Sequence, residues 1–582
     1  KDKRNSNCHP EGYQMLPRLG GCSDAVALCS LGAAVAATTP FVGVDPHHAA
    51  ALAMAGTTWL GYRVLEKVSF SKAAFDSNVA ISSSAKTPDL AGGAGMLIGY
   101  KVEDGRPVYV PDEDLMRHLF ILGQSGVGKT VLGANLIFQQ IARGGGLTFI
   151  DGKMTDEELQ KIWQMCAWCG RERDLFIINP GRPEMSNTYN PLLYGDPDEI
   201  ADRPISTIPQ NDSNPGTDYY RKAAHQGIVT LVSAMKKAGL AYNFIDFAVM
   251  LMNSKALEEL ERKLMEVAPN SDEARAFSLF VDQFRYSAKP GADATIDMKR
   301  LKEVFGGIGQ RMYLLGTGKF GEVLNSYTPD LNLFEAIMNN KIIYVQLPTM
   351  GKNEAAMNFA KMFISDFRTS ISWLQDLPEE NKLQIPHFFF MDEAGGYVSM
   401  NMTRPFEQAR SARVILCPAA QTMANFKAIS EEFAEMVIGN TWTKLIFKVG
   451  TQASAEEMAE VAGMHIVNVR QVAEARNKGT SSQLLRLDPA ASESEGLSET
   501  VTYKEQEENR VSADQLKALG KGECVMLYGG DQVHHLKIPM LKFDSQEAKK
   551  FGKPRVHRFR KRAVKGADFF KNAEKYLSRK MS

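Results

Sequence analysis

The chain is poor in cysteine and has no excess charge of either sign. Its 582 residues include 7 cysteines, too few for a secreted scaffold held together by disulfides. Lys and Arg number 68, as do Asp and Glu, so the formal net charge is zero. Hydrophobic residues make up 44% and charged residues 23%, which excludes a collagen, a wholly disordered chain and a polytopic membrane protein. The length indicates about three or four structural units.

Long uncharged runs are also scarce, and the one that could span a membrane lies near the start. Residues Ala25–Val44 carry no formal charge over 20 positions, enough for a helix to cross roughly 30 Å of hydrocarbon. A weaker apolar stretch, Ala49–Tyr62, follows a short turn, and basic residues flank the pair on both sides. These features predict a transmembrane hairpin within residues 1–70, with both ends on the cytoplasmic side. A signal-peptide cleavage region and a buried helical hairpin are the alternatives.

The other end of the chain carries a charge asymmetry that the overall balance hides. Residues 541–582 contain 14 Lys or Arg against 4 Asp or Glu, a net charge of +10. Basic side chains are interleaved with phenylalanines in residues 546–582, which we call the basic tail. This composition favours binding to nucleic-acid phosphate, an acidic adaptor protein or anionic lipid. The alternative is a solvated extension.

The strongest motif in the chain is a phosphate-binding loop, or P-loop. Its pattern is Gly, four residues, then Gly-Lys-Thr, and its members are Gly123, Gln124, Ser125, Gly126, Val127, Gly128, Lys129 and Thr130. An apolar run precedes the loop and helical spacing of apolar residues follows it, which is the strand–loop–helix order that phosphate binding needs. Backbone N–H groups would hold phosphate oxygens, Lys129 would reach the β- and γ-phosphates, and Thr130 would hold Mg²⁺. We therefore predict a site for ATP and Mg²⁺.

A P-loop needs an acidic partner at the end of another buried strand. The apolar run His387–Met391 ends in Asp392 and Glu393. Asp392 is predicted to bind Mg²⁺ through water, and Glu393 to polarise the water that attacks the γ-phosphate. Together with the P-loop, this pair predicts an ATPase.

Other apolar runs predict the sheet around these motifs. Core strands are expected at 147–153, 175–180, 341–347, 413–417, 444–449 and 524–528. Strands that alternate with helices predict an α/β fold with a doubly wound, largely parallel sheet. The stretch 223–318 shows helical patterns without a convincing strand, such as Phe244–Met252 and Ala256–Val267, and predicts an all-α insertion.

Two polar stretches, 196–217 and 477–509, are interpreted as loops, the second as a mobile excursion between core elements. The predicted domains are the transmembrane hairpin (1–70), the nucleotide-binding domain in two parts (71–222 and 331–545), the all-α insertion (223–330) and the basic tail (546–582).

The order of these motifs resembles one family. Its elements here are the hairpin, GQSGVGKT, a strand ending in Asp151-Gly152-Lys153, Asn190-Pro191-Leu192, the helical insertion, FFFMDEA, Gln421 and Ser512–Leu516. Over most of residues 20–540 the chain resembles the type IV secretion coupling proteins, the TraG/TraD-like conjugation ATPases. The Asp-Gly-Lys strand, followed by Gly170–Leu175, is similar to the Dot/Icm-like and IncI-plasmid-like branch.

The resemblance implies a homohexameric RecA-like P-loop motor in the bacterial inner membrane, with its ATPase domain in the cytoplasm. It would deliver DNA–relaxase complexes or effector proteins to the type IV secretion channel. Gln421 resembles the family's γ-phosphate-sensing glutamine, and Arg410 the arginine that reaches a neighbouring subunit's nucleotide. Arg413 is physically able to play the same part. A soluble FtsK/HerA-like DNA pump and a membrane recruitment scaffold with nucleotide-controlled assembly are the two alternatives.

Overall fold

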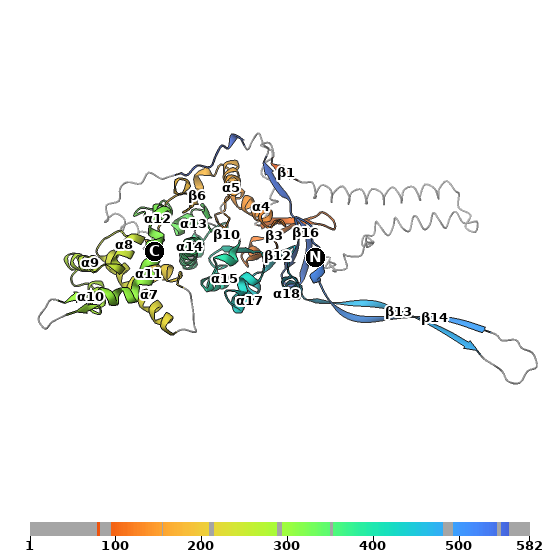
Figure 1. The fold of residues 1–582 in the computed structure, drawn as a ribbon. Helices are drawn as coiled ribbons and strands as arrows, with labels where there is room; N and C mark the ends of the chain where they lie inside the picture. The colour runs from red at the N-terminus through yellow and green to blue at the C-terminus, as the bar shows by residue number, and fades with distance from the viewer. Residues whose placement is uncertain are drawn as a thin grey trace, which may run out of the picture.

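The computed structural model describes residues 78–81, 95–153, 155–208, 215–287, 294–349, 353–480, 493–543 and 549–557. An 11-stranded sheet lies at its centre, with an all-helical unit on one side and a long two-stranded hairpin projecting from the other (Figure 1). The strand order is β3-β2-β16-β15-β12-β4-β11-β10-β5-β9-β6. The strands are β2 (Gly95–Lys101), β3 (Pro107–Pro111), β4 (Leu119–Leu122), β5 (Leu147–Asp151), β6 (Leu175–Ile178), β9 (Ile342–Gln346), β10 (His387–Met391), β11 (Val414–Ala420), β12 (Thr443–Phe447), β15 (Glu523–Tyr528) and β16 (Gln532–Lys537).

Seven neighbouring strands, from β12 to β6, run parallel. These strands are short and mostly apolar, as expected for a parallel sheet that is covered on both faces. Alternate side chains of β4 enter two separate cores, Phe120 and Leu122 on one face and Leu119 and Ile121 on the other. The predicted doubly wound, largely parallel sheet is confirmed for this part.

Four further strands make the sheet mixed. All of their pairings are antiparallel: β15 pairs with β12, β16 with β15, β2 with β16, and β3 with β2. A tight turn joins β15 to β16, with Gly529 and Gly530 at positive φ. A parallel connection would need a crossover of about a dozen residues or more, so the short turn dictates antiparallel pairing. This antiparallel edge was not predicted from the sequence.

Helices cover both faces of the sheet. α4 and α5 pack on one core, and α14 packs on the other. The α-helices around the sheet are α3 (Asp112–Leu115), α4 (Lys129–Ala142), α5 (Asp156–Trp168), α13 (Leu333–Met338), α14 (Asn353–Gln375), α15 (Thr403–Gln408), α16 (Ala424–Lys427), α17 (Glu431–Gly439), α18 (Gln452–Ala462) and α19 (Ala513–Ala518). Short 3-10 helices are η2 (Glu172–Asp174), η3 (Pro183–Met185), η4 (Glu379–Asn381), η5 (Ala394–Gly396) and η6 (Met400–Met402).

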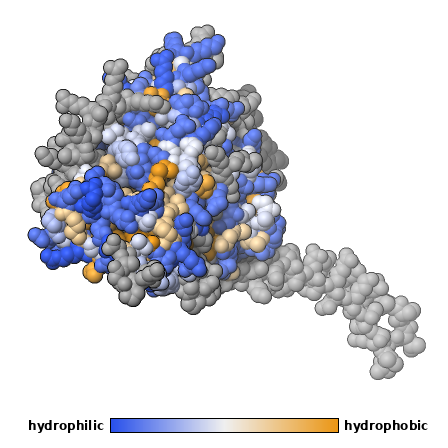
Figure 2. Space-filling model, turned by 60° about the vertical axis from the view of Figure 1, so that its left-hand side comes forward, coloured by the Kyte–Doolittle hydropathy of each residue, from blue (hydrophilic) through white to orange (hydrophobic). Residues whose placement is uncertain are grey.

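The insertion predicted at 223–330 is mainly helical with one small β-ribbon, and it belongs to a helical unit that begins earlier, at α6. Its helices are α6 (Pro197–Ile205), α7 (Pro215–Lys237), α8 (Phe244–Met252), α9 (Ser254–Val267), α10 (Asp272–Asp282), α11 (Met298–Gly316) and α12 (Gly318–Leu324), and its ribbon pairs β7 (Arg285–Tyr286) with β8 (Thr295–Ile296). The face turned toward the viewer in Figure 2 is mainly hydrophilic, with scattered hydrophobic side chains. Exposed hydrophobic residues of the unit include Val249 and Leu279.

The interpretation of 196–217 as a loop is wrong for a large part of it. α6 begins inside this stretch with a capping box, in which Asp196 and Glu199 satisfy each other's backbone N–H groups, and with Pro197 at its first turn. α7 begins at Pro215. Pro and Asp at a helix start were mistaken for loop composition.

The interpretation of 477–509 as a loop is also wrong for its described residues, 477–480 and 493–509. β13 (Met464–Thr480) and β14 (Glu493–Asn509) form an antiparallel ladder 17 residues long, which projects from the body (Figure 1). Backbone pairing forms this ladder whatever the polarity of the side chains, so a polar and acidic composition did not exclude strands. β-branched residues such as Val467, Val469 and Thr502 favour the extended conformation.

The remaining features lie near the two ends of the chain. The predicted transmembrane hairpin, 1–70, lies outside the described residues; among the helices that the structure does describe, none combines the length and apolar character of a membrane span. β1 (Asn78–Ile81) pairs in parallel with β17 (Met540–Phe543). Residues 549–557, which we call the strap, lie against α5 and form the described part of the basic tail.

Candidate nucleotide site

The P-loop lies where the sequence predicts, between the buried strand β4 and helix α4. Its first two residues are held at the ends of the neighbouring strands: Gly123 N donates to Ala420 O at 3.1 Å, and Gln124 N donates to Lys448 O at 2.9 Å. Ser125 and Gly126 are exposed, whereas Val127 is buried. The loop is therefore anchored at its base and open at its tip.

The glycines of the loop are required by its backbone shape and by close neighbours. Gly126 and Gly128 have φ of 78° and 128°, in the region that favours glycine. A Cβ on Gly128 would lie 3.1 Å from Phe447 Cε1 and 3.2 Å from Gly522 Cα. Because the helix that follows carries no side-chain cap, its first N–H groups are available to phosphate oxygens.

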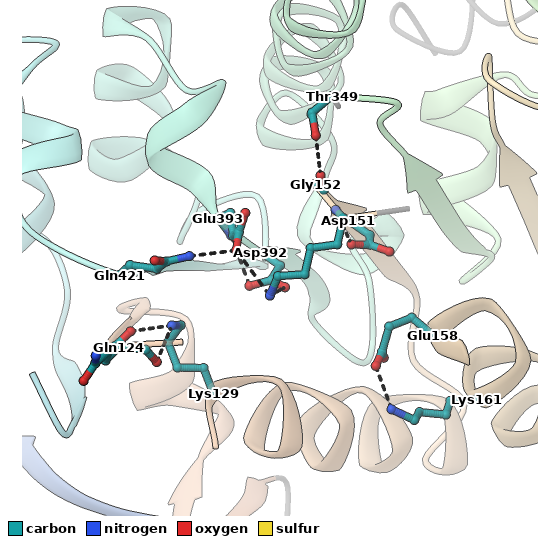
Figure 3. Close-up of polar contacts among 12 residues, drawn as sticks. Gln124, Lys129, Asp151, Gly152, Glu158, Lys161, Thr349, Asp392, Glu393 and Gln421 are labelled. Carbon is teal, nitrogen blue, oxygen red and sulfur yellow. Dashed lines mark hydrogen bonds and ion pairs between the residues drawn. The ribbon is translucent and has the colours of Figure 1, made fainter. Parts of the chain in front are cut away.

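Lys129 is the first residue of α4 and is almost fully buried, with 5% of its surface exposed. Its ammonium donates to the carbonyl of Gly123, and to Gln124 O at 3.1 Å (Figure 3). Burial lowers the pKa of Lys129, and the carboxylates of Asp392 and Glu393 partly oppose this. Thr130 is next to it in the first turn of α4, where a hydroxyl can reach a metal bound to phosphate.

Asp392 and Glu393 directly follow β10, at the same edge of the sheet as the P-loop. Asp392 is 2% exposed, and burial raises the pKa of its carboxyl against the opposing effect of Lys153. Glu393 is partly exposed and has a φ of 54°, a left-handed conformation that is unusual for a non-glycine residue and is a form of strain found at functional sites.

Gln421, for which the resemblance implied a γ-phosphate-sensing role, lies beside Glu393. It follows the last residue of β11, and its Nε2 donates to Glu393 Oε1 at 2.9 Å (Figure 3). The pairing of β11 with β4 puts Gln421 next to the start of the P-loop. The structure therefore brings together Lys129, Thr130, Asp392, Glu393 and Gln421 at the carboxyl ends of three adjacent strands.

Lys153 is a residue of this site to which the sequence analysis gave no role. Its Nζ lies 3.3 Å from Asp392 Oδ2 and 3.3 Å from Glu393 Oε1. Burial alone would lower the pKa of Lys153, but the two carboxylates outweigh it and raise the pKa above its usual value. The Asp-Gly-Lys motif at the end of β5 was the available signal, because β5 is the direct neighbour of β10 in the sheet.

Buried groups fix the backbone that carries Lys153. Asp151 accepts from Lys153 N at 2.8 Å and from the Tyr344 hydroxyl at 2.7 Å, and Thr349 Oγ1 donates to Gly152 O at 2.8 Å. Asp151 is 1% exposed, and burial raises the pKa of its carboxyl. This arrangement holds the lysine's backbone in place and leaves its side chain free to turn.

Arg410 lies away from this chain's own P-loop. It is exposed and sits in the turn before β11, whereas Gln421 follows the opposite end of that strand. A seven-residue strand spans roughly 20 Å, so Arg410 cannot reach the Lys129 site of the same chain. Among the described residues, no carboxylate lies within ion-pairing distance of Arg410. Arg413, in contrast, pairs with Glu379 Oε1 at 2.6 Å and donates to Leu383 O at 2.9 Å.

The residues present fit a nucleotide with Mg²⁺. The P-loop offers a cradle in which Gly126 faces open space and a Cβ on Gly128 would clash. The buried carboxylate of Asp392 already accommodates a cation, the ammonium of Lys153. Oxygen ligands from Thr130 and Asp392 suit Mg²⁺, which keeps several waters and binds through one or two protein groups and phosphate.

Comparisons with known proteins find a matching family and a curated relative over parts of the chain. Residues 386–521, which include Asp392, Glu393, Arg410 and Gln421, match the family described as the TraM recognition site of TraD and TraG. The chain is 23% identical over 405 residues to the type 4 coupling protein DotL of Legionella pneumophila subsp. pneumophila. This match covers 62% of the chain and 51% of DotL, so the chain spans about half the length of that curated relative.

Solved structures of the plasmid coupling protein TrwB share the fold. The complex with a non-hydrolysable ATP analogue, ADPNP, aligns with a TM-score of 0.51 and 13% identity, and covers 78% of this chain and 91% of TrwB. The complex with ADP and Mg²⁺ aligns with a TM-score of 0.50 and 14% identity, and covers 79% and 92%. At this identity the likeness shows the fold alone.

The fold and the site define a P-loop protein with the RecA-like ATPase fold and a mixed, largely parallel sheet. The resemblance to the type IV coupling proteins is confirmed by the family match, by DotL and by TrwB. The DotL match agrees with the Dot/Icm-like branch.

Proposed function

We propose that this chain is an ATP-hydrolysing type IV coupling protein. The observation that carries the proposal is the convergence of the P-loop, the Asp392–Glu393 pair and Gln421 at one edge of the sheet. These groups follow three strands that are adjacent in space, although β4 lies far from β10 and β11 in the sequence. A parallel sheet binds ligands at the carboxyl ends of its strands, which is where they meet.

Each side chain has a step to perform. Backbone N–H groups of the loop bind phosphate oxygens, and Lys129 turns from the loop carbonyls to the β- and γ-phosphates. Thr130 and Asp392 would hold Mg²⁺, which neutralises charge on the β- and γ-phosphates. Glu393 orients and polarises a water molecule for attack on the γ-phosphorus. Gln421, which already donates a hydrogen bond to Glu393, senses whether the γ-phosphate is present.

Arg410 completes the site of a neighbouring subunit in a homohexamer. Its exposure, its distance from its own P-loop and its lack of an ion pair among the described residues support this role. In this arrangement a guanidinium supplied in trans stabilises the charge that develops on the transferred phosphoryl group. Arg413 is engaged by Glu379 and Leu383 and supports the local fold instead.

The proposed biological role is to recruit cargo and deliver it to a type IV secretion or conjugation channel. The name of the matched family, TraM recognition, and the coupling function in the names of DotL and TrwB support it. DNA–relaxase complexes and effector proteins are the proposed cargo classes. The apolar stretch Ala25–Val44 supports the proposal of an anchor in the bacterial inner membrane, with the ATPase body in the cytoplasm.

Steady-state ATP hydrolysis with and without single-stranded DNA tests this role. We expect the full chain to hydrolyse ATP and DNA to stimulate it several-fold, as in a motor that engages nucleic acid. Turnover indifferent to DNA would contradict nucleic-acid cargo and favour effector proteins. Negligible turnover, even in assembled oligomers, would contradict the motor and favour a recruitment scaffold.

A further inference from the structure

The ammonium of Lys153 occupies the space between the two carboxylates that Mg²⁺ binding and water activation both need. Its Nζ is 3.3 Å from an oxygen of Asp392 and 3.3 Å from an oxygen of Glu393. The oxygen of Glu393 involved is Oε1, the same atom that accepts the hydrogen bond from Gln421 at 2.9 Å. One oxygen of the proposed base is thus engaged by two donors.

A carboxylate oxygen has two lone pairs, so an oxygen that accepts from two donors has none left for a water. A charge-assisted contact with an ammonium is stronger than a neutral hydrogen bond. For Glu393 to polarise an attacking water through Oε1, at least one of these two donors has to leave that oxygen. A γ-phosphate can compete with Glu393 for the ammonium of Lys153, because it has three charged oxygens around the phosphorus atom that the water attacks.

Geometry allows Lys153 to make this exchange. In the proposed mechanism Glu393 reaches the γ-phosphorus through one water molecule, and the ammonium 3.3 Å from Glu393 lies at the same edge of the sheet as the P-loop. The backbone at Lys153 is fixed by Asp151 and Thr349, whereas its side chain is 37% exposed and unbranched. The ammonium can therefore turn from carboxylate to phosphate without movement of β5.

We propose that Lys153 is a γ-phosphate-binding residue that holds Oε1 of Glu393 until ATP is bound. It pairs with Asp392 and Glu393 in the absence of nucleotide and moves to the γ-phosphate oxygens when ATP and Mg²⁺ bind. This transfer releases Glu393 Oε1 toward water. ADP lacks the γ-phosphate, so it gives the ammonium no phosphate oxygen to which it can move from Glu393. The inference rests on the proposed ATPase function and assigns to the same site a device that distinguishes ATP from ADP.

Equilibrium binding of ADPNP and of ADP, each with Mg²⁺, tests the assignment without hydrolysis. The variant is Lys153→Met in the full chain, which removes the charge and keeps an unbranched side chain only one atom shorter. We expect its affinity for ADPNP to fall about tenfold, the effect of one lost charge-assisted contact, whereas its affinity for ADP stays within about twofold of wild type. Lys153→Arg, which retains a cation, should recover most of the ADPNP affinity.

Lys161→Met is the matched control, because Lys161 lies on α5, pairs with Glu158 and contacts none of the site's carboxylates in Figure 3. It should bind both nucleotides as wild type does. An unchanged ADPNP-to-ADP affinity ratio in Lys153→Met would overturn the inference and leave the proposed function intact. A wild-type chain that binds neither nucleotide would instead overturn the proposed function itself. Thermal unfolding of each variant separates either result from a loss of fold.

Discussion

Gly128 shows at the scale of one residue how the chain specifies a phosphate cradle. Its φ of 128° lies in a region that favours glycine, and a Cβ would make close contacts with Phe447 and Gly522. We expect Gly128→Ala to lose most of the affinity for ADPNP and to cost about 1–2 kcal/mol of stability from the unfavourable backbone conformation. Isothermal titration and urea unfolding measure the two effects.

Gly144 is the control for this substitution. It also has a positive φ, 84°, but nothing lies within 4 Å of the Cβ that Gly144→Ala would add. This variant should lose stability by a similar backbone cost and keep full nucleotide affinity. Equal losses of affinity in both variants would show that the Gly128 result reports general destabilisation.

His387 makes the stability of the fold depend on pH. It is fully buried at the start of β10, its Nε2 lies 2.8 Å from Thr148 Oγ1, and burial lowers its pKa to about 3. The unfolded chain takes up this proton near pH 6.5 and the folded chain only near pH 3, so its contribution to stability is present above pH 6.5 and falls as the pH drops. Between pH 7 and pH 5 the loss is about 2 kcal/mol.

Urea unfolding of wild type and His387→Gln at pH 7 and pH 5 measures this effect. The wild type should lose about 2 kcal/mol more than the variant on acidification, because Gln does not titrate. Equal losses in the two chains would contradict the assignment of a neutral, buried His387.

At the scale of elements, the strap on α5 joins distant parts of the chain. Trp163 Nε1 donates to Phe551 O at 2.9 Å, Gln160 Nε2 donates to Gly552 O at 3.0 Å, and the rings of Trp163 and His557 stack with centroids 6.2 Å apart. The basic tail therefore starts from a fixed position on the body. The sequence had offered partner binding or a solvated extension for the tail, and its described part, the strap, instead packs on the same chain.

Trp163→Phe tests how the strap is held. The substitution removes the N–H donor, leaves Phe551 O without that bond and should weaken docking by about 1 kcal/mol, or roughly fivefold. Limited trypsin digestion should cut after Lys550 and Arg555 correspondingly faster. Trp373→Phe, which removes the hydrogen bond from Trp373 to Glu199 on another part of the surface, should leave these cleavage rates unchanged. Equal acceleration in both variants would contradict a specific role for Trp163.

The elements also show what could be predicted from the sequence. Short apolar runs such as β4 and β10 were placed correctly, because burial on both faces of a parallel sheet demands such sequences. The hairpin of β13 and β14 was missed because its backbone pairing does not need an apolar pattern. α6 was missed because Pro197 and its neighbouring acidic residues resemble a loop when the cap is not recognised.

The candidate site was predictable to the extent that its motifs are local. The P-loop and the Asp392–Glu393 pair can each be recognised from a few consecutive residues. Lys153 joins them only because β5 pairs with β10 across more than 200 residues, a neighbourhood that no local pattern specifies. The choice between Arg410 and Arg413 likewise required the contacts of Arg413 with Glu379 and Leu383.

At the scale of the whole molecule, the position of Arg410 predicts an assembly that completes each site between subunits. We expect Arg410→Ala to hydrolyse ATP poorly alone and to regain activity when mixed with Glu393→Gln subunits, which supply an intact Arg410 to sites with an intact Glu393. Arg413→Ala should show no such rescue, because its contacts lie within one subunit. Hydrolysis measured across mixing ratios decides this, and a rate equal to the sum of the two variants alone would contradict a role in trans.

If the P-loop and the carboxylate pair form one ATP-hydrolysing site, a substitution in the P-loop should impair nucleotide binding, and a substitution of Glu393 should impair hydrolysis alone. ADPNP binding and steady-state ATP hydrolysis should be measured on the full chain, on Lys129→Ala and on Glu393→Gln. We expect Lys129→Ala to lose tight binding, and Glu393→Gln to bind as wild type does while its turnover falls at least a hundredfold. Hydrolysis by Glu393→Gln at the wild-type rate would contradict the account.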